Sequence, residues 1–223
     1  MSTLASSGRS RGRHPDRAVC VVSGRSFAGS GARFVRVAKL KHLQQGIRIR
    51  RETPGDAEEI SALVGAAFAL AAHSAPPVSA GGPPGEVDLL EWLRKDVGWL
   101  PNLALVAVLD GRIVGQVVCT RALVDGAPAL GLGPLSVIPE SQGQGVGTAL
   151  VRAVLARAEE GGETLVALVG DPAYYRRFGF VPAKALGVTS PDPGYGDYFQ
   201  ARRLGDGEHP QGRFQYAAPF DRL

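Results

Sequence analysis

The chain has 223 residues, of which 44% are hydrophobic and 21% are charged, and both values are close to those of an average globular protein. They argue against a wholly disordered chain, and the longest apolar runs, such as residues 103–109, are too short for a membrane span of about 20 residues. The two cysteines, Cys20 and Cys119, form neither a disulfide framework nor a zinc-binding pattern. This usage predicts a reducing, cytoplasmic location.

The basic charge of the chain is concentrated in its first 46 residues. Residues 1–46 contain nine Lys or Arg and one acidic residue, a net charge of +8, whereas residues 47–223 contain 16 basic and 20 acidic residues, a net charge of −4. Because residues 1–46 are rich in Ser, Gly and Arg and lack hydrophobic periodicity, we expect a disordered tail followed by a single domain over residues 47–223. An inert tail, a transit peptide and a polybasic arm are all compatible with this composition. The mildly acidic domain is not expected to bind nucleic acid or a membrane.

The domain is expected to begin with a strand and an amphipathic helix. Residues 47–51 alternate apolar and charged side chains, as a strand does. Thr53, Pro54 and Asp56 then have the residue types of a helix start. Apolar side chains at helical spacing predict one buried face, formed by Ile60, Leu63, Val64, Ala67 and Phe68.

The remaining pattern mixes strands and helices. The expected elements are a loop over residues 71–85, a helix over 86–95, strands over 103–109, 112–121 and 129–138, a helix over 147–160, a strand over 164–169, a short helix from Pro172 and a C-terminal β region. Asp110-Gly111 is a hairpin signal, and Gly126 predicts a second turn. This order predicts an α/β (α+β) domain with a mixed sheet.

Three glycines alternate with other residues just before the helix predicted at 147–160: Gly143, Gly145 and Gly147. Without Cβ atoms the backbone can approach a ligand closely, and the first N–H groups of a helix have no partner within it. The helix dipole adds about half a positive charge there, so the segment can bind a phosphate or pyrophosphate. It lacks the lysine of a P-loop and the acidic residue of a dinucleotide fold. A glycine-rich turn without a ligand is the alternative.

Two motifs resemble those of a known family. Gln142-x-x-Gly145-x-Gly147, between a strand and a helix, resembles the acyl-CoA loop of the GNAT-type N-acetyltransferase superfamily. Tyr175-x-x-x-Gly179-Phe180 resembles the end of that superfamily's short helix. The resemblance covers about residues 47–185. Residues 170–175 and 212–220 are similar to a bacterial branch of predicted acetyltransferases called YhbS-like. It implies a mixed, mostly antiparallel sheet with a splayed parallel strand pair, flanked by helices.

The same resemblance implies acetyl-CoA as co-substrate and no metal. The cofactor would lie between the strands at 132–138 and 164–169. Backbone groups of Leu135, Ser136 and Val137 would pair with the pantetheine, and one amide there would polarise the thioester carbonyl. The pyrophosphate would be held by the N–H groups of Gln142, Gly143, Gln144, Gly145, Val146, Gly147 and Thr148.

Tyr175 occupies the place of the superfamily's tyrosine, which would protonate the departing CoA thiolate. A phenol, with an ordinary pKa near 10, is neutral at pH 7 and able to donate a proton. The alternatives are that Tyr175 only packs in the core, or that Tyr174 takes its role. Asp171 is expected to cap the short helix. No residue is identified as the general base, although Glu52 and Asp96 have suitable side chains.

The resemblance thus implies an N-acetyltransferase that transfers an acetyl group from acetyl-CoA directly to a primary amine. The acceptor would be a small molecule or a protein, and a homodimer is one possible assembly. Residues 70–85 and 194–199 are expected to border the acceptor site, with little charge to recognise a substrate. A non-catalytic acyl-CoA-binding regulatory module is the alternative, and binding of nucleic acid or membrane by the tail is a second one.

Overall fold

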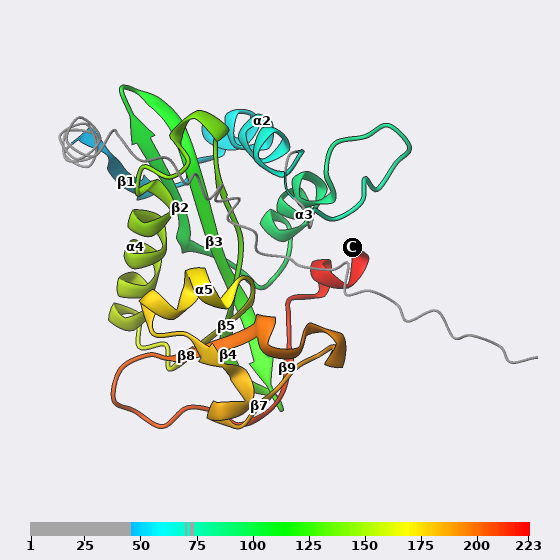
Figure 1. The fold of residues 1–223 in the computed structure, drawn as a ribbon, viewed down its shortest axis with the longest axis vertical. Helices are drawn as coiled ribbons and strands as arrows, with labels where there is room; N and C mark the ends of the chain where they lie inside the picture. The colour runs from blue at the N-terminus through cyan, green and yellow to red at the C-terminus, as the bar shows by residue number, and fades with distance from the viewer. Residues whose placement is uncertain (1–45, 70, 72–73) are drawn as a thin grey trace, which may run out of the picture.

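The fold is built on an extended mixed sheet (Figure 1). The structure is a computed structural model that describes residues 46–69, 71 and 74–223. The basic tail predicted over residues 1–46 therefore lies outside the described residues, apart from Gly46. The strands within the described residues are β1 (Arg48–Arg51), β2 (Trp99–Leu109), β3 (Arg112–Val124), β4 (Ala127–Val137), β5 (Leu165–Val169), β6 (Val181–Pro182), β7 (Val188–Thr189), β8 (Phe199–Arg203) and β9 (Gly212–Gln215).

The strands are arranged in the order β1-β2-β3-β4-β5-β8-β6. Neighbours from β1 to β4 are antiparallel, β4 and β5 are parallel, and β8 is antiparallel to both β5 and β6. β9 pairs with the end of β3 and with β7. The predicted mixed, mostly antiparallel sheet with one parallel pair in its centre is therefore confirmed.

Helices cover both faces of the sheet (Figure 1). The α-helices are α2 (Ala57–Phe68), α3 (Gly85–Arg94), α4 (Val146–Glu160) and α5 (Pro172–Tyr175), and short 3₁₀ turns span Pro54–Asp56, Pro139–Ser141, Arg176–Phe178, Ala183–Leu186, Pro193–Tyr198 and Ala218–Arg222. Apolar side chains of α4 pack with one face of β2 to β5, and those of α2 and α3 pack with the other face. All five apolar side chains predicted for the buried face of α2 are buried.

Two tight turns join the central strands. All four residues of these turns, Asp110-Gly111 and Asp125-Gly126, have positive φ, between 45° and 85°. Two-residue hairpin turns favour positive φ because the backbone twist of such a turn matches the right-handed twist of the strands that it joins. β3 is longer than the sequence pattern predicts, because its last residues pair with both β4 and β9. This longer hairpin extends to the end of the molecule where β7 and β9 lie.

A partly buried ion pair stabilises the start of α2. The Asp56 carboxylate accepts two hydrogen bonds from the Arg50 guanidinium, at 2.6 and 2.8 Å, and two from the Thr53 N–H and hydroxyl, at 2.7 and 2.8 Å. The Arg50 guanidinium, aided by the Thr53 donors, holds the pKa of Asp56 well below its ordinary value. A carboxylic acid whose pKa is lower in the folded state stabilises the fold fully at pH values above its unfolded pKa, near 4. This contribution is lost progressively as the pH falls from about 4 towards the lower pKa of the folded state.

Replacing Asp56 with asparagine is therefore expected to lower the free energy of unfolding by about 1–2 kcal/mol at pH 7, since the charge-assisted hydrogen bonds are lost. The difference from wild type should shrink as the pH is lowered from 5 to 3. Urea unfolding at these three pH values measures it, with Asp110→Asn in an exposed turn as the control. A difference that stays constant between pH 7 and pH 3 would contradict the assignment.

The connection between α2 and α3 is anchored at the start of α3. The fully buried Glu86 carboxylate accepts hydrogen bonds from the Ala75 N–H at 2.6 Å and the Ser74 hydroxyl at 3.0 Å. Burial raises the pKa of Glu86, and these hydrogen bonds act in the opposite direction. A Cβ at Gly85 would lie 2.9 Å from the Leu223 side chain, so this connection and the C-terminus lie side by side.

In the described part of the chain, none of the helices has the length and apolar character needed to cross a bilayer.

Candidate functional site

The parallel strands β4 and β5 separate in the middle of the sheet. They pair only at Leu130 with Val166 and at Gly131 with Ala167, although β4 continues to Val137 and β5 to Val169. Beyond this point β4 stays paired with β3, and β5 stays paired with β8. The facing backbone edges of β4 and β5 therefore form a fork, and an extended ligand can pair with such an edge as an added strand does.

A bulge in β4 begins two residues after Gly131, the last residue of β4 that pairs with β5. Val117 pairs with Leu135 and Cys119 pairs with Leu132, so Gly133 and Pro134 together face the single residue between Val117 and Cys119. Such an extra residue bends the strand and redirects its backbone groups. The bulge contributes to the divergence of β4 from β5.

The buried side chain of Gln116 on β3 holds the bulge in place. Its amide Nε2 donates to the Pro134 carbonyl and to the Ser136 hydroxyl, both at 3.2 Å. We did not expect Gln116 to contribute to the site from the sequence. The available signal was a polar amide within the apolar run of a central strand, since a buried polar group needs partners.

The glycine loop connects the end of β4 to the start of α4. Gly143 and Gly145 have φ values of 71° and 91°, a left-handed conformation that glycine adopts without strain. Gly145 is the N-cap residue, and Ala149 is the first residue to donate back to it, at 2.9 Å. The N–H groups of the three residues between them, Val146, Gly147 and Thr148, thus have no acceptor within the helix.

The charge at the start of α4 favours an anion. The first turns of α2 and α3 each carry two acidic side chains, whereas the first turn of α4 carries none. The predicted residues Gln142 and Gln144 are used within the loop itself. Their side-chain amides donate to the carbonyls of Val137 and Glu140, at 3.0 and 2.6 Å, and the Gln142 N–H donates to Pro139. The free amides of this loop therefore start after Gln142.

Tyr174 lies against the start of α4. A Cβ at Gly147 would stand 2.8 Å from the Tyr174 hydroxyl, so the last glycine of the motif makes room for this phenol. The Arg177 guanidinium lies over the Tyr174 ring, 4.8 Å from its centroid, and its Nε donates to the Tyr174 carbonyl at 2.9 Å. As expected, Asp171 caps α5 by accepting the Ala173 N–H at 2.8 Å. A hydroxyl and a guanidinium thus lie close to the start of α4.

Tyr175, the predicted proton donor, is fully buried. Its ring packs edge-on against Tyr174 and Phe180, with centroids 4.9 and 5.6 Å apart. It belongs to the core cluster that includes Leu132 and Leu168, and its helix α5 begins at Pro172, three residues after the end of β5 at Val169. Tyr175 is therefore placed in the core beside the fork, while Tyr174 lies nearer the glycine loop.

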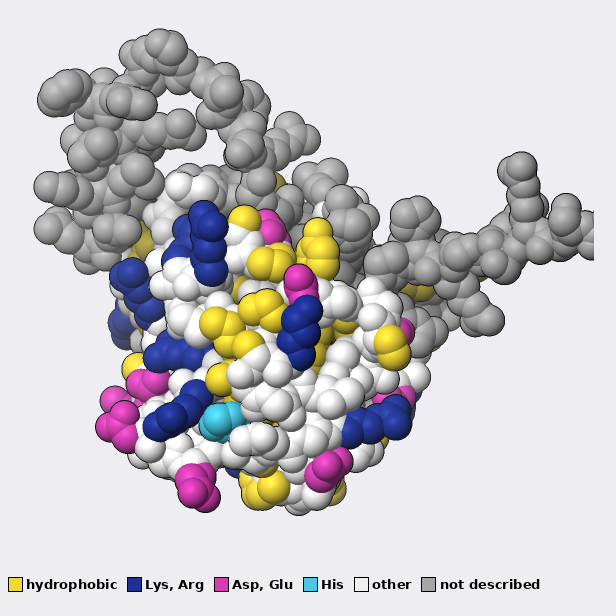
Figure 2. Space-filling model, turned by 60° about the horizontal axis from the view of Figure 1, so that its bottom comes forward, with side chains coloured by type: hydrophobic (Ala, Val, Ile, Leu, Met, Phe, Trp, Pro, Cys, Tyr) yellow, Lys and Arg dark blue, Asp and Glu magenta, His cyan; other side chains and the backbone are white. Residues whose placement is uncertain are grey.

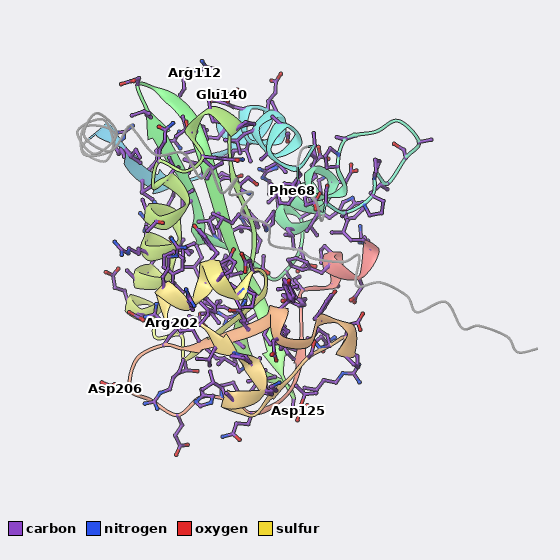
Figure 3. All side chains as sticks on the ribbon, viewed as in Figure 1. Phe68, Arg112, Asp125, Glu140, Arg202 and Asp206 are labelled. Atoms are coloured by element: carbon purple, nitrogen blue, oxygen red, sulfur yellow. The ribbon has the colours of Figure 1, made fainter. Side chains whose placement is uncertain are left out.

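Other acidic side chains weighed as a general base serve the fold. Glu52 forms an ion pair with Arg94 at 2.6 Å, and Asp96 accepts the Gly98 N–H at 2.7 Å. Glu140 is exposed in the turn before the glycine loop, at the end of the molecule where Figure 3 also labels Arg112. Within the residues that the structure describes, no three His, Cys, Asp or Glu side chains are grouped as metal ligands would be.

The fork, the bulge and the acid-free start of α4 together have the form of a GNAT-class acyltransferase site. A family model described as an acetyltransferase (GNAT) domain matches residues 101–182. The uncharacterized N-acetyltransferase YhbS of Escherichia coli is 36% identical over 161 residues, which cover 71% of this chain and 87% of YhbS. YjhQ, another uncharacterized N-acetyltransferase of Escherichia coli, is 39% identical over 113 residues. That match covers 48% of this chain and 62% of YjhQ, slightly less than two thirds of its length.

The chain belongs to the GNAT family of N-acetyltransferases, and its enzyme class is that of an acyltransferase. Two crystal structures with similar folds carry a ligand. YhbS from Escherichia coli, in complex with CoA, has a TM-score of 0.68 and 32% identity, covering 78% of this chain and 92% of that one. A GNAT family acetyltransferase from Brucella melitensis, in complex with acetyl-CoA, has a TM-score of 0.62 and 35% identity, covering 78% and 98%.

Proposed function

We propose that the chain transfers an acetyl group from acetyl-CoA directly to a primary amine. The observation that carries this proposal is the fork between β4 and β5, which leads directly to the acid-free, glycine-capped start of α4. An extended pantetheine can pair with the open strand edge, and the pyrophosphate at its end can then accept hydrogen bonds from the free amides at the helix start. Two relatives of similar fold were solved with CoA or acetyl-CoA bound, which supports the proposal.

In this proposal the backbone holds most of the cofactor. The edges of Leu135, Ser136 and Val137 pair with the pantetheine, and an amide beside the bulge polarises the thioester carbonyl. The N–H groups from Gly143 to Thr148 bind the pyrophosphate. Arg177, stacked on Tyr174 near the same helix start, adds a positive charge for the phosphates.

The reaction needs one proton donor and one proton acceptor. The amine nitrogen attacks the carbonyl carbon, a C–N bond forms and the C–S bond breaks, so the sulfur leaves as a thiolate. We assign protonation of that thiolate to the Tyr175 phenol, which lies in the core beside the fork. The attacking amine loses its proton to water.

Thermal unfolding of the full-length chain with acetyl-CoA, CoA and NAD in parallel tests the binding step. At about 100 times Kd, binding adds about 2.7 kcal/mol, which corresponds to a rise in melting temperature of about 5–10 °C. We expect this rise with acetyl-CoA and CoA and none with NAD. Release of free CoA thiol on addition of an amine then tests transfer. Binding without amine-dependent thiol release would favour the regulatory acyl-CoA-binding module, and an equal rise with NAD would contradict both functions.

A further inference from the structure

The fork is covered, on one face of the sheet, by an aromatic side chain near the C-terminus. A Cβ at Gly131, the last residue of β4 that pairs with β5, would stand 2.8 Å from the Tyr216 ring. The Tyr216 ring packs against the rings of Phe214 and Phe220, with centroids 4.7 and 4.9 Å apart. Tyr216 therefore lies directly on the vertex of the fork.

Tyr216 lies on the face opposite α4. Gly131 pairs with Thr120 of β3, so the two residues point to the same face. Thr120 and Val118, two residues apart on an extended strand, share that face, and Val118 packs with α2 and α3. The fully buried Thr120 hydroxyl has no hydrogen-bond partner among the described residues. Tyr216 thus marks the side of the fork that α4 and its anion seat do not occupy.

A pocket of about 720 Å³ has Tyr216 in its wall. The rest of the wall comes from the β3–β4 turn at Asp125-Gly126, from β9, from residues 191–195 and from the end of the chain. This volume is typical of small-molecule sites. Figure 2 brings this β7–β9 end of the molecule forward, where hydrophobic side chains gather near the centre of the view and charged side chains lie both among them and around them.

The pocket has an excess of negative charge. Its wall contains three exposed carboxylates, Asp125, Asp192 and Asp221, against one guanidinium, Arg213. Two of the carboxylates are fixed by the backbone, because Asp125 accepts the Arg213 N–H at 3.1 Å and Asp192 accepts the Gly194 N–H at 2.7 Å. None of the three takes part in the five ion pairs between described residues.

A neighbouring base does not neutralise the pocket. Arg222 follows Asp221, but its guanidinium lies over the Trp92 ring on α3, 5.1 Å from the centroid. The pocket wall therefore combines aromatic rings with exposed carboxylates, and both attract a cation.

We propose that this pocket binds the amine acceptor, and that the acceptor is a small linear amine with a second cationic group. This inference rests on the proposed function. The nitrogen to be acetylated lies beside Tyr216 at the fork, where it must be uncharged to attack. The second ammonium lies among the carboxylates, which favour the charged form of an amine. An eight-carbon chain can meet both requirements, since Asp221 follows Phe220, whose ring centroid lies 4.9 Å from that of Tyr216.

Three acceptors that differ only at the far end test this proposal with the full-length protein: 1,8-diaminooctane, 1-aminooctane and 8-aminooctanoate. Their far ends are positive, neutral and negative at pH 7. We expect kcat/KM to fall in that order, with about a tenfold advantage of the diamine over the monoamine. That advantage should decrease as salt is raised, because the carboxylates are exposed and screened.

Charge-removing variants place the effect in the pocket. Asn at position 192 keeps the oxygen that accepts the Gly194 N–H, and Asp221 is exposed, so the two changes remove charge with little effect on the fold. The double variant Asp192→Asn, Asp221→Asn should lose most of the diamine advantage, about tenfold, mainly through KM. The control is Asp206→Asn, an exposed carboxylate at the other end of the same edge of the molecule from Asp125 (Figure 3), which should retain it.

The outcomes separate this inference from the proposed function. If acetyl-CoA does not raise the melting temperature, the proposed function fails, and the inference fails with it. If acetyl-CoA binds and amines release CoA thiol, but the three acceptors are used equally, 8-aminooctanoate is preferred, or a lysine-containing peptide is used far better than the diamine, the inference alone is overturned. If acetyl-CoA binds and no amine releases CoA thiol, the transfer function fails, and the inference fails with it. The same holds if the double variant keeps the diamine preference.

Discussion

Replacing Gly145 with aspartate is expected to weaken acetyl-CoA binding at least tenfold more than replacing it with asparagine. Gly145 is the N-cap of α4 with φ 91°, and Asn and Asp are the residues that best tolerate positive φ after glycine. The two variants have nearly the same shape and differ by one negative charge. In the proposed function this charge would stand among the amides that bind the pyrophosphate, where each anion repels the other.

The stability of the ligand-free variants should change in the other direction. An aspartate at a helix start is favoured by the helix dipole, so Gly145→Asp is expected to be at least as stable as Gly145→Asn without ligand. Calorimetric titration with acetyl-CoA and thermal unfolding of the free proteins measure the two effects. Equal affinities in two folded variants would move the pyrophosphate site away from this loop. A loss of affinity that only follows a loss of stability would point to misfolding instead.

Local sequence signals predicted the elements that short-range physics determines. The apolar spacing on α2 gave its buried face correctly, and Asp110-Gly111 gave the hairpin between β2 and β3. Such features depend on periodicity and turn chemistry within about ten residues. The pairing of β9 with both β3 and β7 could not be read in this way. Residues about 90 positions apart along the chain meet there, and short polar strands carry little register information.

The candidate site divides along the same line. The glycine loop and its helix form one continuous segment, so the motif from Gln142 to Gly147 was enough to predict left-handed glycines directly before a helix start. Pyrophosphate binding there stays a prediction. The pocket opposite α4 collects Asp125, Asp192 and Asp221 from three distant segments. The sequence predicts little charge at the acceptor site, because residues 70–85 and 194–199 carry little, whereas the proposed acceptor pocket takes its carboxylates from outside those two segments. Only the fold adds these charges together.

Tyr174 and Tyr175 are neighbours on one helix, and a sequence motif alone does not show in which direction each side chain points. Tyr174 and Tyr175 are adjacent, yet one reaches the glycine loop and the other is fully buried near the fork. The side chains of successive helical residues point about 100° apart. Because the two side chains have different surroundings, we expect replacement with phenylalanine to have a different effect on activity at each position.

Replacing Tyr175 with phenylalanine is expected to lower kcat about 100-fold or more, with little change in KM for acetyl-CoA. Phenylalanine keeps the ring that packs against Tyr174 and Phe180 and removes only the proton donor, and loss of a general acid typically costs 10²–10⁴-fold. The defect should shrink as the pH rises above the ordinary thiol pKa, near 8.5, since a thiolate then leaves without protonation.

Tyr174→Phe is the matched control, and it should raise KM for acetyl-CoA more than it lowers kcat, because its hydroxyl adjoins Gly147. Steady-state kinetics with varied acetyl-CoA and a fixed amine separates the two. An unchanged kcat in Tyr175→Phe would leave that side chain a purely structural role, and a large kcat defect in Tyr174→Phe would transfer the proton donor to Tyr174.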